Sequence, residues 1–272
     1  MNSKNDELFP NTKTVYGPVP SRRFGNSIGV DPIFEISTCT FNCIYCQLGN
    51  IQKQTVERKV FVPTEKVVND LKELMAQNVN FDVLTFSGSG EPTLALNLKE
   101  MSFELKKLVR QKELLLLTNG SLLHRPDVRA DLENFDKVIV KLDALEGDSL
   151  KRINRPHADV SFEKIIEGIK SLRPQYKGKI EIQTMVFRVP TDKELEELAA
   201  IYRDIKPDAI QINTPTRPYP LSWHRENRGN HLAIFDYEVK NLVHVSKDEA
   251  RKIEQRLNEL TGVKLISVYK EE

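Results

Sequence analysis

Three cysteines are the residues of this 272-residue chain whose types and spacing point most directly to chemistry, and all of them lie in one segment, CTFNCIYC. Cys39, Cys43 and Cys46 have the spacing C-x3-C-x2-C, which lets a single loop wrap three thiolates around one metal centre. A [4Fe–4S] cluster held by three cysteines keeps one iron without a protein ligand, so that iron can bind another molecule. The spacing therefore favours an iron–sulfur centre with an open coordination site.

Two other interpretations of the cysteines remain open. A structural zinc ion normally takes four N or S ligands, so a histidine would have to supply the fourth. The histidines are His124, His157, His224, His231 and His244, and none stands at a short, finger-like spacing from the cysteines. The cysteines could instead be free core thiols, but their loop also contains the polar residues Thr40, Asn42 and Gln47.

A strand–loop–helix order repeats along the chain and gives the cysteine loop a setting. Short apolar runs predict strands at residues 27–37, 82–92, 113–120, 136–144, 179–190 and 209–215. Amphipathic segments predict helices at residues 96–112, 121–135, 161–175 and 191–205. Repeated β/α units require a parallel sheet with crossover helices, so we expect an α/β fold, a partial (β/α)6 barrel. The active site of such a fold lies at the carboxyl ends of its strands.

The C-terminal part of the chain differs in composition from this repeat. We expect residues 1–215 to form the barrel with an N-terminal arm, and residues 216–272 to form an extension packed on it. The extension begins with a segment rich in Pro, Arg and His, and is predicted to contain a helix at residues 246–260 and a strand at residues 263–269.

Composition and charge exclude several classes of protein. Lys and Arg number 40 against 39 Asp and Glu, so a formal charge of +1 gives no general attraction to nucleic acid or membrane surfaces. No apolar run approaches the ~18 residues that suggest a membrane span. The polar N-terminus lacks the apolar centre of a secretory signal, and an odd number of cysteines suits a reducing compartment. We therefore expect a cytoplasmic protein.

A second motif follows the predicted strand at residues 82–92. In the segment SGSGEP, Ser89 and Gly90 are small enough to let the main chain approach a ligand closely. Glu91 can accept a charge-assisted hydrogen bond from an ammonium group. The alternative is a plain turn that precedes a helix.

Together these motifs resemble the radical S-adenosylmethionine superfamily. The loop CTFNCIYC, with Tyr45 before the third cysteine, is similar to the family's cluster loop, and SGSGEPTL is similar to its glycine-glycine-glutamate segment. The resemblance implies a [4Fe–4S] cluster whose open iron chelates the amino and carboxylate groups of S-adenosylmethionine. It also implies one-electron cleavage to methionine and a 5′-deoxyadenosyl radical that removes a hydrogen atom from a substrate.

The resemblance implies further cofactor-binding residues at the strand ends. Gly88, Ser89, Gly90 and Glu91 would hold the methionine amine, and Tyr45 would frame the adenine. Thr118 and Asn119, in LTNG, would face the cofactor. Lys141 and Asp143 are two residues apart in a predicted strand, so they share one face of it. If that face is the barrel interior, they could bind a carboxylate and a ribose hydroxyl; the alternative is a solvent-facing salt bridge. Gln183 and Asn213 are weaker candidates, with polar barrel packing as the alternative.

The segments VYGPVPSRRFGNSIGVDP, CQLGN and QINTPTRP resemble the group of this superfamily that includes wyosine-type tRNA-modifying synthetases. Arg22, Arg23 and Arg217 are candidate substrate residues, because guanidinium groups suit phosphates and carboxylates. RNA recognition would place them beside aromatic side chains, for which the candidates are Tyr16, Phe24, Tyr219 and Trp223. Alternatively, the first two arginines tie the N-terminal arm to acidic residues of the barrel. His224 and His231 are expected to be surface or packing residues.

Three functions remain open from the sequence. The first is a radical reaction on a small-molecule or protein substrate, with the segment Pro215–Leu232 folded over a closed pocket. The second is modification of tRNA or a nucleotide, with the three arginines at the barrel mouth beside exposed aromatic residues. The third is a non-catalytic iron–sulfur or zinc-binding module. Either radical reaction needs an external electron donor such as flavodoxin or ferredoxin, because no cysteines remain for a second cluster.

Overall fold

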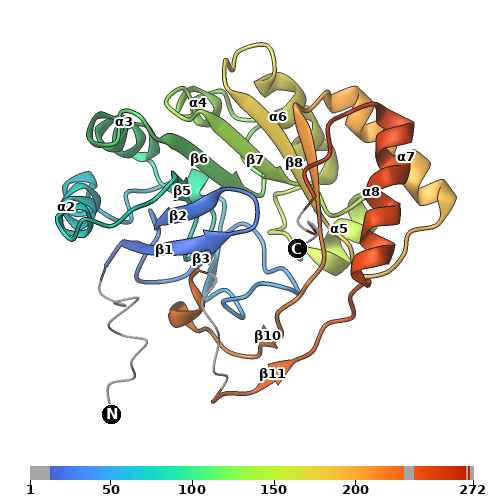
Figure 1. The fold of residues 1–272 in the computed structure, drawn as a ribbon, viewed down its shortest axis with the longest axis horizontal. Helices are drawn as coiled ribbons and strands as arrows, with labels where there is room; N and C mark the ends of the chain where they lie inside the picture. The colour runs from blue at the N-terminus through green and yellow to red at the C-terminus, as the bar shows by residue number, and fades with distance from the viewer. Residues whose placement is uncertain (1–12, 230–235, 268, 270–272) are drawn as a thin grey trace.

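A computed structural model describes residues 13–229, 236–267 and 269, and its centre is a seven-stranded sheet of order β1-β2-β5-β6-β7-β8-β9 (Figure 1). β2 pairs in parallel with β5, and each later strand pairs in parallel with the next. The bounds are β1 Val15–Ser21, β2 Gly25–Val30, β5 Val83–Phe86, β6 Glu113–Thr118, β7 Lys137–Lys141, β8 Lys179–Met185 and β9 Ala209–Asn213. The expected α/β fold with a mostly parallel sheet is confirmed.

Helices lie along the outer side of the curved sheet, each in the connection that follows a strand (Figure 1). Their bounds are α2 Thr64–Met75, α3 Leu98–Leu108, α4 Pro126–Ala130, α5 Gly147–Ile153, α6 Phe162–Leu172, α7 Asp192–Ile205 and α8 Lys247–Thr261. The side chains of Ser161, Thr191 and Ser246 cap the first turns of α6, α7 and α8. At the start of α7 the Thr191 hydroxyl accepts from Glu194 N, and the Glu194 carboxylate accepts from Thr191 N.

Two predicted elements need correction. The helix expected at residues 121–135 is reduced to α4, because Pro126 starts it and the preceding residues form turns. Over its described residues, the strand expected at residues 263–269 makes one parallel bridge, between Ile210 and Leu265, because this part of the chain bonds to both sides of Ile210 and to no further residue of β9. Val268 lies outside the described residues.

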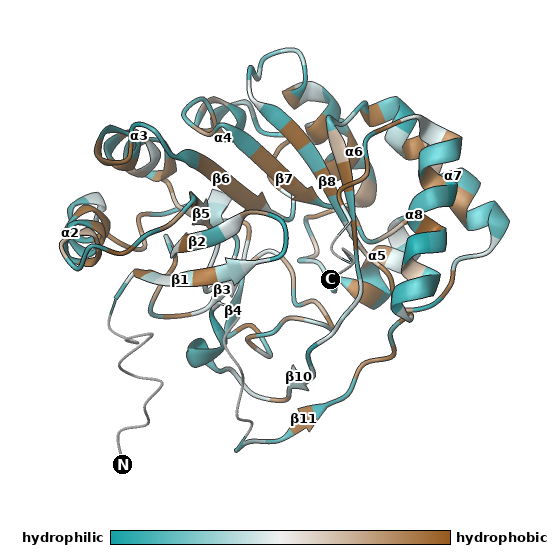
Figure 2. Ribbon diagram, in the orientation of Figure 1, coloured by the Kyte–Doolittle hydropathy of each residue, from teal (hydrophilic) through white to brown (hydrophobic). Residues whose placement is uncertain are grey.

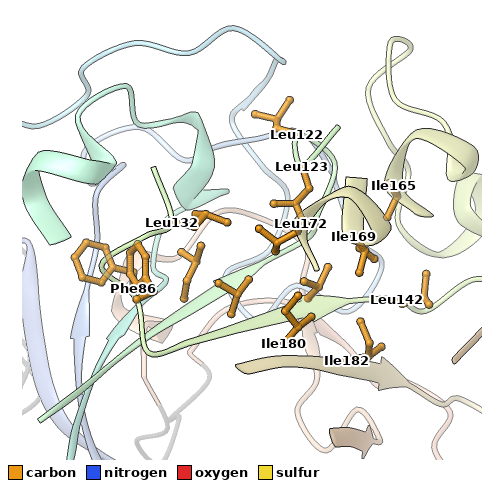
Figure 3. Close-up of a cluster of buried hydrophobic side chains, with 14 of the residues drawn as sticks. Phe86, Leu122, Leu123, Leu132, Leu142, Ile165, Ile169, Leu172, Ile180 and Ile182 are labelled. Carbon is orange, nitrogen blue, oxygen red and sulfur yellow. The ribbon is translucent and has the colours of Figure 1, made fainter. Parts of the chain in front are cut away.

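Alternation along the strands separates the two faces of the sheet. Leu114, Leu116, Val138 and Val140 are buried against the helices, where they join the main hydrophobic core. Figure 3 shows part of this core, to which α6 contributes Ile165 and Ile169 and β8 contributes Ile180 and Ile182. Figure 2 shows the same division, with hydrophobic strands at the centre and hydrophilic outer faces on the helices.

The opposite, inner face of the sheet carries both apolar and polar side chains. Val83, Leu115 and Ile139 form a small separate cluster with the partly buried Phe24 and Leu117. β7, β8 and β9 also place the polar residues Lys141, Gln183 and Asn213 on this face, one from each strand. Across the described residues, no helix is both long and apolar enough to cross a membrane.

Candidate active site

A cavity of about 430 Å³ lies at the carboxyl ends of the parallel strands, on the inner face of the sheet. Cys39, Cys43 and Cys46 all line it. The predicted cofactor-binding residues also line it, with the exceptions of Ser89 and Asp143: they are Tyr45, Gly88, Gly90, Glu91, Thr118, Asn119, Lys141, Gln183 and Asn213. The fold therefore brings together residues that lie as far apart in the sequence as the cysteine loop and the end of β9.

The cysteine loop is fixed to the end of β5 by main-chain hydrogen bonds. Thr38 N donates to Ser89 O (3.2 Å), and Glu91 N donates to Thr38 O (3.1 Å). Gly90 is required at this contact, because a Cβ atom added to it would lie 1.8 Å from Thr38 O. Gly90 thus permits close approach of the cysteine loop, which is a structural reason for the glycine that does not depend on a ligand.

The three thiols are half-buried and receive hydrogen bonds from neighbouring amides. Phe41 N donates to Cys39 Sγ (3.4 Å), and Asn154 Nδ2 donates to Cys43 Sγ (3.4 Å). Asn119 Nδ2 lies 3.6 Å from Cys39 Sγ. Hydrogen bonds to sulfur are one of the means by which a protein tunes the reduction potential of an iron–sulfur cluster.

Burial raises the pKa of all three cysteines, and it raises the pKa of Cys43 to about 12. The thiols are therefore protonated in the absence of metal, and binding iron would release those protons. Nowhere in the described ranges do three His, Cys, Asp or Glu side chains converge on one metal ion. A [4Fe–4S] cluster does not need such convergence, since each cysteine binds a different iron atom. Three thiols around one cavity therefore fit the cluster.

Glu91 is buried, with 2% of its surface exposed, and its carboxylate accepts hydrogen bonds from three residues. Oε1 accepts from Thr93 N (3.1 Å), Thr93 Oγ1 (2.6 Å) and Thr118 Oγ1 (2.6 Å), whereas Oε2 accepts from Asn119 N (2.8 Å). Burial raises the pKa of Glu91, and these hydrogen bonds oppose the rise. Oε2 thus accepts one of these hydrogen bonds and Oε1 accepts three, so Oε2 has capacity for an ammonium donor from the cavity.

Ser89 and Gly88 lie against the buried carboxylate of Asp31, which does not line the cavity. Ser89 Oγ donates to Asp31 Oδ2 (2.5 Å), and Asp31 also forms an ion pair with Arg228 (3.0 Å). Gly88 has φ +111° and an added Cβ would lie 2.4 Å from Asp31 Cγ, so only glycine fits there. The Ser89 side chain is therefore a partner of Asp31, and Ser89 does not line the cavity.

Asp143 does not line the cavity, but it holds three residues that do, Tyr45, Lys141 and Met185. Its Oδ2 accepts from the Tyr45 hydroxyl and from Asn154 Nδ2 (2.8 Å), and its Oδ1 accepts from Met185 N (2.8 Å). Lys141 Nζ lies 3.1 Å from Oδ1 and 4.9 Å from the centre of the Tyr45 ring. A solvent-facing salt bridge is therefore wrong for this pair, because the Asp143 side chain is fully buried.

Gln183 and Asn213 line the cavity, but their amides bind an arginine. Arg23 Nη1 donates to Asn213 Oδ1 (2.6 Å). With its amide oxygen turned toward Arg23, Gln183 accepts from both terminal guanidinium nitrogens (3.2 and 3.1 Å). Arg22 is exposed, and Arg217 donates to Gly229 O (2.8 Å). Arg23 thus joins the N-terminal hairpin to β8 and β9, through the side-chain amides of Gln183 and Asn213.

The first part of the C-terminal extension, up to Gly229, packs over the cysteine loop, whereas α8 packs on α7 and β9. His224 N donates to Leu48 O (2.8 Å), and the side chains of Gln47 and Asn227 each donate to the other residue's carbonyl oxygen (3.0 Å). Arg228 and Gly229 line the cavity. The segment Pro215–Leu232 therefore covers the cysteine loop as far as Gly229; its last residues, which include His231, lie outside the described residues.

The aromatic candidates for RNA stacking are not exposed. Tyr16 and Tyr219 are buried, with 5% and 7% of their surface exposed, and Phe24 and Trp223 are half-buried. The arrangement expected for an RNA surface is therefore not seen. His224 is a packing residue as expected, since its ring stacks on Tyr237 with 3.5 Å between ring centres.

Sequence reasoning missed Asp31, Asn154 and Arg228. Asp31 directly follows β2, and a polar residue at the carboxyl end of a parallel strand is a signal that could have found it. Asn154 and Arg228 follow no predicted strand. Arg228 pairs with a residue 197 positions away, and no local pattern indicates that contact.

Comparison with known proteins gives a family for this arrangement. The model of the radical SAM superfamily matches residues 36–201. The UPF0026 protein slr1464 of Synechocystis sp. is 48% identical over 80% of this chain and 81% of its own length. Among solved structures, a radical SAM methyltransferase from Sphaerobacter thermophilus has a TM-score of 0.57 at 14% identity, covering 89% of this chain and 65% of its own. Streptococcus suis SuiB bound to S-adenosylmethionine has a TM-score of 0.58 at 12% identity, covering 88% of this chain and 46% of its own.

Proposed function

The chain belongs to the radical SAM superfamily, and on that premise we propose that it cleaves S-adenosylmethionine reductively and uses the 5′-deoxyadenosyl radical to abstract hydrogen from a small molecule. It is an enzyme of the radical SAM type, and its cofactors are a [4Fe–4S] cluster and S-adenosylmethionine. One observation carries the proposal: the three cysteines, Glu91 and Lys141 line a single cavity at the carboxyl ends of the parallel strands.

The roles of the cavity residues follow from their contacts. Cys39, Cys43 and Cys46 would hold the cluster, which supplies the electron for cleavage of the sulfonium bond when S-adenosylmethionine is bound. Glu91 Oε2 would accept from the methionine ammonium, because its other oxygen is already occupied by Thr93 and Thr118. Lys141 Nζ would bind an anionic or hydroxyl oxygen of the cofactor.

The remaining predicted residues would act through these contacts. Asp143 would fix Tyr45 beside the adenine and hold Lys141 in place, and Asn119 would orient Cys39 and Glu91. The polypeptide at Gly88 and Gly90 would form the wall next to the methionine end, with Ser89 fixing that wall to Asp31.

The cover formed by residues 215–229 supports a small-molecule substrate. Two residues of this cover, Arg228 and Gly229, line the cavity. A cover of this kind excludes water, which protects a reactive intermediate from side reactions. A protein substrate or tRNA would have to displace this cover. We propose an external one-electron donor, flavodoxin or ferredoxin, because all three cysteines of the chain are assigned to one cluster and none is left for a second. We also propose a cytoplasmic location.

Product analysis after anaerobic reconstitution tests the proposal. Wild-type protein with dithionite and S-adenosylmethionine should form methionine and 5′-deoxyadenosine in equal amounts, detected by liquid chromatography and mass spectrometry. The variant Cys43→Ala should form neither. A fully loaded wild-type protein that forms no 5′-deoxyadenosine would disprove the proposed reaction.

Filter binding with bulk tRNA at two salt concentrations tests the alternative of tRNA modification. Binding to phosphates weakens steeply as salt rises, so a tRNA enzyme should retain tRNA at low salt and lose it at high salt. We expect no retention at either concentration. Retention at low salt would favour the tRNA reaction over the small-molecule reaction.

A further inference from the structure

The cavity of about 430 Å³ that the cysteines line is called the cofactor cavity. A second, smaller cavity of about 180 Å³ adjoins it. Arg22, Arg23 and Arg217 all line it, and we call it the arginine cavity. Two of the arginines come from the turn between β1 and β2, and the third follows β9. Ser21, Arg23, Tyr45, Gln47, Met185 and Asn213 line both cavities. A molecule that occupies the arginine cavity would therefore be in contact with the place where the cofactor binds.

The lining of the arginine cavity is positive. No carboxylate is present among the described residues that line it, while three guanidinium groups and several hydroxyl groups are. Glu181 acts on Arg23 electrostatically, but it already forms an ion pair with Lys137 (3.2 Å) and accepts from Gln211. This distribution of charge favours binding of an anion.

The arginines are also placed for an anion. Arg23 is fixed by Asn213 and Gln183, and its buried Nε has no hydrogen-bond partner among the described residues, so Arg23 contributes positive charge to the cavity rather than a free donor. Burial, and then the positive charge of Arg22, lower the pKa of Arg23 to about 10, and the same two causes lower the pKa of Arg217. Arg22 is thus near enough to repel each of the other two guanidinium groups, and a multiply charged anion would offset that repulsion.

We propose that the arginine cavity binds the phosphate group of a phosphorylated small-molecule substrate. The proposal rests on the proposed function, because it assigns the substrate of the same site. A phosphate ester carries up to two negative charges and offers several acceptor oxygens to forked guanidinium donors, whereas a carboxylate carries one charge. With its phosphate in the arginine cavity, the substrate can extend its carbon skeleton past Met185 into the cofactor cavity.

Titration calorimetry with inorganic phosphate tests the assignment, using the full chain at constant ionic strength with acetate as a second probe. We expect saturable binding of one phosphate per chain and weaker binding of acetate. Arg22→Gln and Arg217→Gln should each reduce the phosphate affinity by at least about tenfold, equivalent to about 1.4 kcal/mol. Arg110→Gln removes an exposed arginine beyond α3, outside both cavities, and should leave the affinity unchanged.

Each outcome decides the proposal. Absence of saturable phosphate binding, or equal affinity in wild type and both cavity variants, would overturn it, and so would acetate binding as tight as that of phosphate. The Cys43→Ala variant, which should lack the cluster, should bind phosphate as the wild type does. A protein that binds phosphate but forms no 5′-deoxyadenosine would therefore refute the proposed reaction without refuting the anion site.

Discussion

Replacement of Arg228 by methionine should destabilise the fold and loosen the cover of the active site. The Arg228 side chain is 3% exposed and Asp31 is fully buried, with 3.0 Å between Nη1 and Oδ2. Removing one partner of a buried ion pair leaves an uncompensated charge and typically costs about 3–5 kcal/mol. Asp31 keeps hydrogen bonds from Ile33 N, Phe34 N and Ser89 Oγ, so we expect a loss near about 3 kcal/mol, the lower end of that range.

Thermal and urea unfolding measure this loss in wild type and variant. A loss of about 3 kcal/mol should lower Tm by roughly 6–12 °C in a protein of this size. The double variant Arg228→Met with Asp31→Asn removes both charges and should be at least about 1 kcal/mol more stable than the sum of the two single changes predicts. Arg110→Met is the matched control and should stay within about 0.5 kcal/mol of wild type.

A second measurement follows the cover itself. Asn227 and Arg228 are adjacent, and together they fix the extension to Gln47 and Asp31, close to Cys46. Iodoacetamide should therefore label Cys46 faster in cluster-free Arg228→Met than in cluster-free wild type. An unfolding free energy within about 0.5 kcal/mol of wild type, or additive effects in the double variant, would refute the role of the ion pair.

Three further predictions concern the cluster, the cofactor and acid stability. Cys43→Ala should reduce the iron bound after anaerobic reconstitution from about four atoms per chain to background by elemental analysis, and iron equal to wild type would contradict the assignment. Glu91→Ala should retain iron but bind S-adenosylmethionine about ten- to a hundredfold more weakly by calorimetry, since a hydrogen bond to a charged group contributes about 1.5–3 kcal/mol; equal affinities would exclude the ammonium contact. Hydrogen bonds from Arg125 and then Arg58 lower the pKa of Asp127 from 3.8 to about 2. The ionised Asp127 carboxylate therefore stabilises the fold above pH 3.8, and this stabilisation is lost as the pH falls toward 2. The Tm of Asp127→Asn should therefore change less with pH across that range than the Tm of wild type, and parallel curves would contradict this.

The elements that the sequence predicts well have patterns that are complete within a few residues. The parallel strands are short apolar runs ending in polar residues, and the apolar positions of β6 and β7 identify them without any neighbour. β1 was not predicted, because Gly17, Pro18 and Pro20 interrupt its pattern. Prolines are tolerated there since β1 is an edge strand, and its edge position depends on the whole sheet.

The helices α2 and α5 show two different reasons for a missed element. α2 is amphipathic, so its sequence contains the signal, although it lies between the cysteine loop and β5 rather than in the strand–helix repeat. α5 has seven residues with one buried side chain, Leu150, which is too short for a helical period to be recognised. Its C-terminal neighbour Asn154 nevertheless contacts both Cys43 and Asp143.

The sequence by itself identified the superfamily and its cofactors, because the cysteine loop and the SGSGEP segment are each complete within a few residues and resemble the superfamily's motifs. Tertiary structure alone decided which predicted residues reach the cavity: Glu91 and Lys141 line it, whereas Ser89 and Asp143 stand behind it. It also decided that Arg228 covers the cofactor cavity and that Arg217 joins the arginines of the first hairpin. Such contacts join residues about 200 positions apart, and their partners are selected by the packing of the whole sheet, so no local pattern of the chain specifies them.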